Sequence, residues 1–197
     1  MGKKVEGMKT LEKLGLPFTP YVLIKPDEID NCEEKLSNFI PNQLGYAIGV
    51  CLRVSVPGEI DREKHGGLHL LNIDEIKANM KEISNKYTEV VFLINHCIDV
   101  LLSGTLMKTN CTVIVECIEE ELAPLVEGRI IPEIWKLNCN NEWENILSLG
   151  VLKKTDLKTF ERYINLLPGE CILEWSISKS GNLYFYEFLE LKKVGIK

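Results

Sequence analysis

The sequence lacks the patterns that mark membrane, secreted or nucleic-acid-binding proteins. Its longest apolar run, Val90–Ile94, is far shorter than the roughly 20 residues that cross a bilayer. The start, Met1–Glu6, has no apolar stretch of the kind found in a secretory signal. Lys and Arg total 23 against 29 Asp and Glu, so the net charge is −6, which disfavours nucleic acid as a partner. These absences predict a cytoplasmic chain with no membrane and no nucleic-acid partner.

The commonest phosphate, nucleophile and metal motifs are also missing. The sequence contains no Gly-x-Gly-x-x-Gly stretch, no Walker A loop and no Gly-x-Ser-x-Gly elbow. It has seven cysteines but no Cys-x-x-Cys pair. An odd count without such spacing favours small buried hydrophobes in a reducing compartment over a zinc site or a disulfide framework.

What remains is the composition of an ordinary globular chain of the α+β class. The 197 residues are 45% hydrophobic and 26% charged. Residues 1–87 lean helical and residues 88–197 lean towards strands, and a cleft between two such halves is a common ligand site. Periodicity predicts a loop over Val56–Gly67 and helices over residues 5–14 and 26–39, around Ile76–Ile83 and over Thr155–Leu167. It predicts strands over Tyr21–Ile24, Tyr46–Val54, Glu89–Asn95, Val100–Met107, Cys111–Ile118, Cys171–Ser178 and Leu183–Leu191.

The C-terminal hairpin carries two acidic residues that the predicted register brings together. A turn centred on Ser180-Gly181 places Glu174 opposite Glu187, and Trp175 opposite Tyr186. Like charges directly opposite each other are unfavourable unless a cation bridges them, one holds a proton, or solvent screens them. Mg²⁺ suits such a pair, because proteins usually bind it through one or two carboxylates plus substrate phosphates. The alternative is an exposed sheet face without a ligand.

Two basic residues are candidates for an anion site. Lys4 precedes the first predicted helix, where it either reaches an anion or belongs to a solvated terminus. Arg53 lies within an otherwise apolar strand, so its charge needs a partner or a ligand. The planar guanidinium fits phosphate, and a buried carboxylate is the alternative partner.

Six segments, spread from end to end of the chain, match in order the motifs of one known family. They are Gly2–Lys4 with Leu14–Pro20, Leu52–Ser55 with Glu59 after it, Phe92–Gly104, Val115-Glu116, Leu125–Pro132, and Ile172–Trp175 with Leu183–Glu187. With these segments the chain resembles the ATP-grasp nucleotide-binding domain of phosphoenolpyruvate synthase and pyruvate phosphate dikinase.

The resemblance implies an ATP-grasp-like α+β fold with two subdomains, 1–87 and 88–197, each an antiparallel sheet with helices, and a cleft between them. It implies ATP and Mg²⁺ as cofactors. Lys4 and Arg53 would contact the phosphates as catalytic residues, and Glu174 with Glu187 would hold Mg²⁺. The nucleotide would further contact Glu116 and the backbone of Ile94, Asn95 and His96.

Three departures from the family pattern bear on activity. The Gly-Leu-Gly-Glu loop of the family corresponds to Glu120–Ala123, its closing Arg-Pro to Leu189-Glu190, and its usual Gln to Asn95. One hypothesis is therefore a MgATP-binding phosphotransferase acting on an unknown acceptor, or with a separate phosphohistidine or pyruvate-binding chain. The second is a degenerate, non-catalytic fold that serves as a binding or interaction module. A plain structural α+β protein is the third.

Overall fold

The computed structural model describes residues 2–40, 47–56, 68–70, 72–87 and 89–191. The chain forms two compact units: unit 1 is Met1–Lys9 with Thr19–Asp99, and unit 2 is Thr10–Phe18 with Val100–Lys197. This division differs from the expected 1–87 and 88–197, because strand β4 (Val91–Ile98) pairs with strands of the first unit. Most of the predicted Val56–Gly67 loop, with Glu59, lies outside the described residues.

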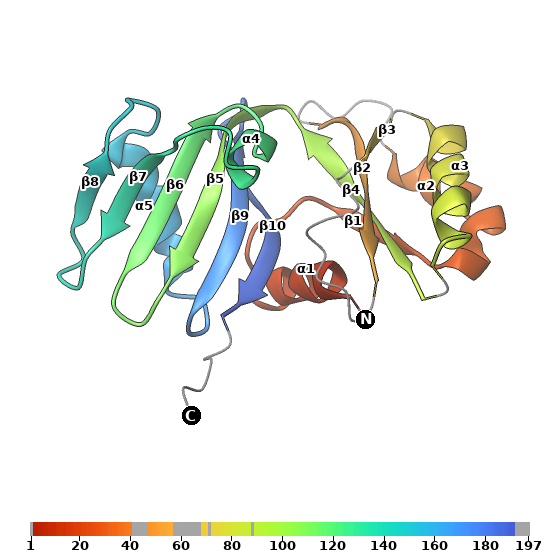
Figure 1. Cartoon of the computed structure of the whole chain (residues 1–197), viewed down its shortest axis with the longest axis horizontal. Helices are drawn as coiled ribbons and strands as arrows, with labels where there is room; N and C mark the ends of the chain where they lie inside the picture. Colours follow the sequence, from red (N-terminus) through yellow and green to blue (C-terminus); the bar gives the residue numbers. More distant parts are fainter. Residues whose placement is uncertain (1, 41–46, 57–67, 71, 88, 192–197) are drawn as a thin grey trace. The chain divides into compact units, whose positions relative to one another are not determined.

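Unit 1 is built on a four-stranded antiparallel sheet in the order β1-β4-β2-β3 (Figure 1). Besides β4, its strands are β1 (Tyr21–Ile24), β2 (Ala47–Ser55) and β3 (Leu68–Leu70). Its helices are the first part of α1 (Lys3–Lys13), η1 (Pro26–Asn31), α2 (Glu33–Phe39) and α3 (Ile73–Ser84). The single helix expected over residues 26–39 is thus two helices.

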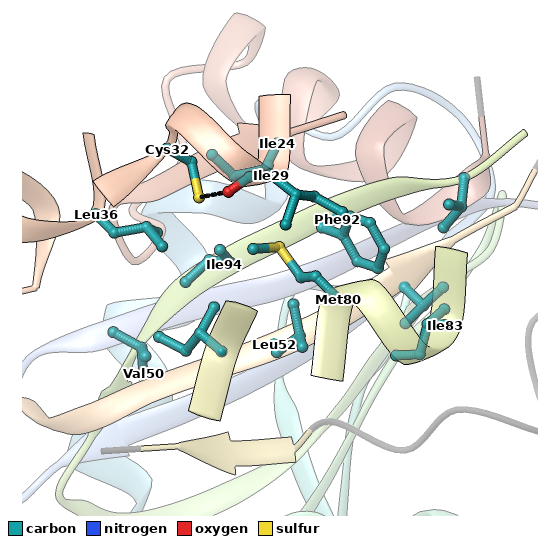
Figure 2. Close-up of a cluster of buried hydrophobic side chains, with 13 residues drawn as sticks. Ile24, Ile29, Cys32, Leu36, Val50, Leu52, Met80, Ile83, Phe92 and Ile94 are labelled. Carbon is teal, nitrogen blue, oxygen red and sulfur yellow. Dashed lines mark hydrogen bonds between the residues drawn. The ribbon is translucent and has the colours of Figure 1, made fainter. Parts of the chain in front are cut away.

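The helices η1, α2 and α3 cover one face of this sheet and enclose an apolar core (Figure 2). Phe92, Ile94 and Leu52 point into it from neighbouring strands, and Met80 reaches it from α3. α3 begins after Asn72, whose Oδ1 accepts a hydrogen bond from the Glu75 N–H at 2.8 Å and so caps the helix. Because residues alternate along a strand, the neighbours of the core residues face the opposite side of the sheet.

Unit 2 is built on a six-stranded antiparallel sheet in the order β10-β9-β5-β6-β7-β8 (Figure 1). Its strands are β5 (Val100–Lys108), β6 (Val113–Glu119), β7 (Glu133–Leu137), β8 (Trp143–Leu147), β9 (Cys171–Ser178) and β10 (Leu183–Glu190). Its helices are α4 (Ala123–Val126) and α5 (Lys154–Ile164), besides the last part of α1. The sequence predicted neither β7 and β8 nor α4. Among the described residues, no helix is both long and apolar enough to cross a bilayer.

Helix α5 packs on one face of this sheet and lies behind it in Figure 1. Its stripe Leu157, Phe160 and Ile164 is buried, and the Phe160 ring meets the Trp175 ring edge-on with centroids 4.8 Å apart. At the C-terminal end of α5, the Lys108 ammonium donates to the carbonyl oxygens of Ile164 (3.0 Å) and Leu167 (2.7 Å). A cation there also interacts favourably with the helix dipole.

The β9–β10 hairpin has a different turn from the one the sequence predicted. Hydrogen bonds from Ser178 N to Asn182 O (2.9 Å) and from Gly181 N to Ser178 O (2.8 Å) define a three-residue loop. Gly181 has a φ of 84°, the left-handed conformation that such loops require. The expected turn centred on Ser180-Gly181 is therefore wrong.

This loop shifts the register of the hairpin near the turn, and a bulge shifts it back. Trp175 pairs with Phe185 rather than with Tyr186, so that expected pair is wrong. Tyr186 is an extra residue on β10, and beyond it Glu187 pairs with Glu174, as expected. The acidic pair is therefore confirmed, although it forms through a bulge that the sequence analysis did not include.

A buried carboxylate anchors the connection that follows β8. Glu133 is completely buried and accepts hydrogen bonds from Trp135 Nε1 (2.6 Å), Leu149 N (3.0 Å) and Val151 N (2.8 Å). Burial acts to raise the pKa of this carboxyl, but the hydrogen bonds outweigh it and the pKa is lowered overall. Glu133 therefore holds the segment after β8 against β7 in its charged form.

Gly104 leaves no room for a side chain at the centre of the sheet. A Cβ at this position would lie 1.8 Å from the carbonyl oxygen of Glu116 and 2.6 Å from Cζ2 of Trp175. We expect Gly104→Ala to lower the free energy of unfolding by about 3 kcal/mol or more, through overpacking. Chemical denaturation measures this, with Leu101→Ala, at an exposed position of the same strand, expected to change stability by less than about 0.5 kcal/mol. A Gly104→Ala protein as stable as wild type would contradict the packing.

Glu133→Gln is expected to destabilise unit 2 in a pH-dependent way. The change places an amide NH₂ group, which can only donate, where the loop presents N–H donors. We therefore expect the free energy of unfolding to fall by about 2 kcal/mol or more at neutral pH. Because the folded pKa is lowered, the contribution of Glu133 is complete above the unfolded value of 4.5 and is lost as the pH falls through the folded pKa. The stability difference from wild type should therefore shrink in acid. Denaturation at several pH values tests this, with exposed Glu142→Gln as the control.

Candidate functional site

Three carboxylates and a hydroxyl form one row across four strands of the unit 2 sheet. Glu187 on β10 pairs with Glu174 on β9, Glu174 pairs with Thr105 on β5, and Thr105 pairs with Glu116 on β6. Directly paired residues of an antiparallel sheet share a face. The neighbouring residues Leu173 and Trp175 are buried on the face that α5 covers. The acidic row, as we call these four residues, therefore lies on the opposite face.

The acidic row is half-buried and partly ordered by hydrogen bonds. All four residues are of intermediate exposure. The Thr105 hydroxyl donates to Oε2 of Glu116 at 2.6 Å, which orients that carboxylate. In the next row of the same face, the hydroxyls of Ser103 and Ser176 are 2.9 Å apart. Hydroxyl and carboxylate groups thus line this face on four adjacent strands.

The donor set of the acidic row fits a hard divalent cation that shares a phosphate ligand. Glu174 and Glu187 offer carboxylate oxygens from adjacent strands, which is the number of protein ligands that Mg²⁺ commonly has. Within the part of the chain that the structure describes, no three His, Cys, Asp or Glu residues are grouped closely enough to hold an ion by themselves. The remaining ligands of a cation at this pair would therefore come from water or from a phosphate-bearing molecule.

In unit 1, the structure brings Lys4 and Arg53 to the same face of the four-stranded sheet. Arg53 alternates with the core residues Leu52 and Val54, so it faces away from the core, and it pairs with Leu93. Ser55 lies on the same side, and a Cβ on Gly2 would be 2.2 Å from its Oγ. Helix α1 therefore begins on this face of the sheet. Lys4 lies in the first turn of the helix, and 9% of its surface is exposed.

The residues expected to contact the adenine base of the nucleotide lie in the central strand β4. Asn95 pairs with both Tyr21 and Cys51, so backbone groups of this strand are directed towards β1 and β2. The Asn95 side chain shares the face of Arg53, and its Nδ2 donates to Thr19 Oγ1 at 3.4 Å. Its Oδ1 is buried and accepts no hydrogen bond from any described residue. Asn95 thus keeps a buried acceptor available on this face.

Ile94 and His96 point to the other side of the same strand. Ile94 belongs to the apolar core of unit 1. The His96 ring packs on Phe39 with centroids 4.5 Å apart, and its Nε2 lies 2.9 Å from the Phe39 carbonyl oxygen. A carbonyl can only accept, so Nε2 donates. These side chains hold α2 to the sheet, and a role of their backbone towards adenine stays a prediction.

The structure therefore assembles the expected residues in two groups. Lys4, Arg53 and Asn95 share one face of the unit 1 sheet, and Glu116, Glu174 and Glu187 share one row of the unit 2 sheet. Their convergence on one nucleotide stays a prediction. Sequence reasoning missed Thr105, Ser103 and Ser176. The signal for them was the alternation of polar and apolar residues along β5 and β9.

The acidic segment at the end of β6 has an unusual backbone. Glu119, Glu120 and Glu121 are exposed, and Glu120 has a φ of 63°. A left-handed backbone costs a residue with a side chain about 1–2 kcal/mol. Two hydrogen bonds hold it, from Glu120 N to Leu101 O (3.0 Å) and from Ser103 Oγ to Glu120 O (2.6 Å). Glycine adopts this backbone conformation most easily, and the resemblance places a glycine at this position.

Comparisons with family models and with curated protein sequences give no match. Solved structures do match in fold. An N5-carboxyaminoimidazole ribonucleotide synthetase in complex with ADP is 14% identical with a TM-score of 0.56, over 95% of this chain and 44% of that one. The D-alanine-D-alanine ligase from Coxiella burnetii is 9% identical with a TM-score of 0.55, over 95% and 46%. D-alanyl-alanine synthetase A from Vibrio cholerae is 13% identical with a TM-score of 0.51, over 95% and 54%.

These relatives in structure are ATP-grasp enzymes, and the chain spans about half of their length. At such low identity the likeness concerns the fold. The expected architecture, with two antiparallel sheets and their helices, is confirmed. The chain has the ATP-grasp fold.

Proposed function

We propose that this chain binds ATP together with Mg²⁺. The observation that carries the proposal is the acidic row, in which Glu174 and Glu187 oppose each other on the half-buried face of the unit 2 sheet. The fold supports it, because matching structures include complexes with ATP and with ADP. Glu174 and Glu187 would hold the cation, and Glu116, oriented by Thr105, completes the acidic side of the site.

Two basic residues of unit 1 are the proposed ligands of the phosphates. Lys4 and Arg53 share a sheet face and would bind the phosphates, the Arg through its planar fork. Asn95 Oδ1 is a buried acceptor to which no described residue donates. This supports an amino group of the adenine base as its hydrogen-bond donor. Ile94 and His96 would contribute backbone contacts beside it. The cation would offset part of the phosphate charge, and proteins catalyse phosphoryl transfer mainly by positioning the groups and by such electrostatic stabilisation.

The finer proposal is a phosphotransferase related to phosphoenolpyruvate synthase and pyruvate phosphate dikinase. The ordered sequence segments, which include Lys4 and Arg53, support it. Lys4 and Arg53 would act as catalytic residues by stabilising charge on the transferred phosphoryl group. The acceptor would be a small molecule or a separate phosphohistidine or pyruvate-binding chain.

A specific observation favours a second candidate, a non-catalytic binding or interaction module. Glu119–Glu121 is an exposed acidic run that begins at the last residue of β6, and Leu189 stands where the family has an arginine. Negative charge near bound phosphates would weaken their binding. Binding of MgATP without its consumption would favour this candidate over the phosphotransferase.

Calorimetric titration with MgATP tests the proposal. We expect wild type to bind with micromolar affinity only when Mg²⁺ is present, and Glu174→Gln to bind at least about tenfold more weakly, since it loses a charged ligand of the cation. Glu190→Gln is the matched control, because it lies on β10 opposite Cys171, on the other face. No heat from wild type, at protein concentrations that reveal micromolar binding, would sink the proposal. Equal binding by Glu174→Gln would overturn the metal assignment.

The same titration tests whether the acidic segment lies near the phosphates. We expect the double variant Glu119→Gln/Glu121→Gln to bind MgATP a few-fold more tightly, because each charge within about 8 Å contributes less than about 1 kcal/mol in salt. Glu142→Gln/Glu144→Gln makes the same charge change on exposed residues next to and within β8 and should leave the affinity unchanged. If both double variants raise the affinity equally, the effect comes from net charge and the placement of the loop is wrong.

A further inference from the structure

Two of the seven cysteines differ from the others in their surroundings. Cys32, Cys97, Cys117 and Cys171 are buried and Cys51 is half-buried, whereas Cys111 and Cys139 are exposed. The expectation of buried hydrophobes therefore fails for these two. Cys111 lies in the connection between β5 and β6, and Cys139 in the connection between β7 and β8. Both connections lie at the same end of the unit 2 sheet (Figure 1).

The sheet register places these cysteines opposite each other. The β6–β7 ladder ends with Val113 paired to Leu137, and two further residues on each strand bring Cys111 opposite Cys139. The structure keeps them together there, because the Cys139 sulfur donates to the backbone oxygen of Cys111 at 3.3 Å. Antiparallel neighbours have Cβ atoms about 4.5–5.5 Å apart. A disulfide needs about 3.5–4.5 Å, so small turn movements suffice.

Both turns have well-defined backbones that present the cysteines at their surface. The β7–β8 turn is closed by Asn138, whose N–H donates to Glu142 O at 3.0 Å and whose Oδ1 accepts from Asn140 N at 2.9 Å. The β5–β6 turn is closed by a hydrogen bond of 2.8 Å from Thr109 N to Thr112 O. The cysteines are therefore held as neighbours, while their exposed side chains are able to change rotamer.

We propose that Cys111 and Cys139 are a modification site, a dithiol that forms a reversible intramolecular disulfide by exchange with a low-molecular-weight disulfide such as glutathione disulfide. One cysteine thiolate attacks the small disulfide, forms a mixed disulfide and releases one small thiolate. The second cysteine thiolate attacks the protein sulfur of that mixed bond, closes the Cys111–Cys139 bond and releases the second small thiolate. Two protein thiols are oxidised, one small disulfide is reduced, and the two protons pass to the released thiolates.

Three of the remaining cysteines are protected from the same exchange. Burial raises the pKa of Cys117 to about 12 and that of Cys171 to about 11, and burial also raises the pKa of Cys32. The thiolate is the form that attacks disulfides, so these buried thiols stay unreactive near neutral pH. The site is independent of the nucleotide proposal, since none of its residues belongs to the acidic row.

The experiment treats the full chain with glutathione disulfide, blocks remaining thiols with N-ethylmaleimide, and identifies digested peptides by mass spectrometry. We expect a peptide pair joined through Cys111 and Cys139, which dithiothreitol separates. Cys111→Ser and Cys139→Ser should each remove the joined pair and leave glutathione on the remaining exposed cysteine. Cys51→Ser, at a half-buried position of unit 1, should keep the joined pair.

Thermal unfolding gives a second readout. Closing the segment between the two cysteines restricts the unfolded chain, so oxidation should raise the melting temperature of wild type and Cys51→Ser by roughly 5–10 °C, with no rise for Cys139→Ser. Three results would overturn the proposal: glutathione on both cysteines without a joined pair, a bond to a different cysteine, or a covalent dimer on a non-reducing gel. Both serine variants change exposed residues, so they are expected to fold and to report on the bond itself.

Discussion

The candidate site depends on one extra residue, Tyr186, in strand β10. The three-residue loop at Lys179–Gly181 sets a register in which Trp175 meets Phe185, and continued unchanged it would bring Tyr186 opposite Glu174. A slip of one residue moves a side chain to the other face of a sheet, so Glu187 would then leave the face of Glu174. The bulge restores the alignment. It thereby creates a cross-strand pair of like charges, an arrangement that a bound cation would stabilise and that otherwise weakens a hairpin.

The remainder of unit 2 supplies a rigid platform for that pair. Because Gly104 has no side chain, β5 and β6 can approach each other beside the Trp175 ring. Phe160 of α5 packs on that ring and covers the apolar face of the sheet. This packing fixes the spacing between the strands on the polar face. The acidic residues of this unit fall into two physical classes. Glu133 is fully buried, its hydrogen bonds come from its own unit, and its lowered pKa keeps it charged as an anchor. The carboxylates of the acidic row are half-buried on the sheet face opposite α5.

The parts of the fold that sequence predicted are those with a strong local pattern. The helical spacing of Leu157, Phe160 and Ile164 predicted α5. The alternation of large residues predicted both strands of the last hairpin. Strand β8 was missed because its residues after Trp143 are exposed and show no apolar alternation, as suits the edge of a sheet. Thr105 was missed for another reason: it joins the site only because β5 lies between β6 and β9. Alternation along β5 marks Thr105 as polar, but the residues that it meets depend on pairing between distant segments, which local periodicity does not contain.

The cysteines show the same limit of local patterns in a different way. The odd number of cysteines and the lack of a Cys-x-x-Cys pair argued against a zinc site or a disulfide framework. Spacing reports neighbours within one turn or loop, however, and says nothing of residues that face each other across two strands. Cys111 and Cys139 meet for the reason that Glu174 and Glu187 meet: an antiparallel ladder fixes which positions are opposite. In the acidic pair the ladder brings together charges that repel, and a cation would relieve this. In the cysteine pair it brings together thiols that can join by oxidation, so one sheet uses register to build two chemically different sites.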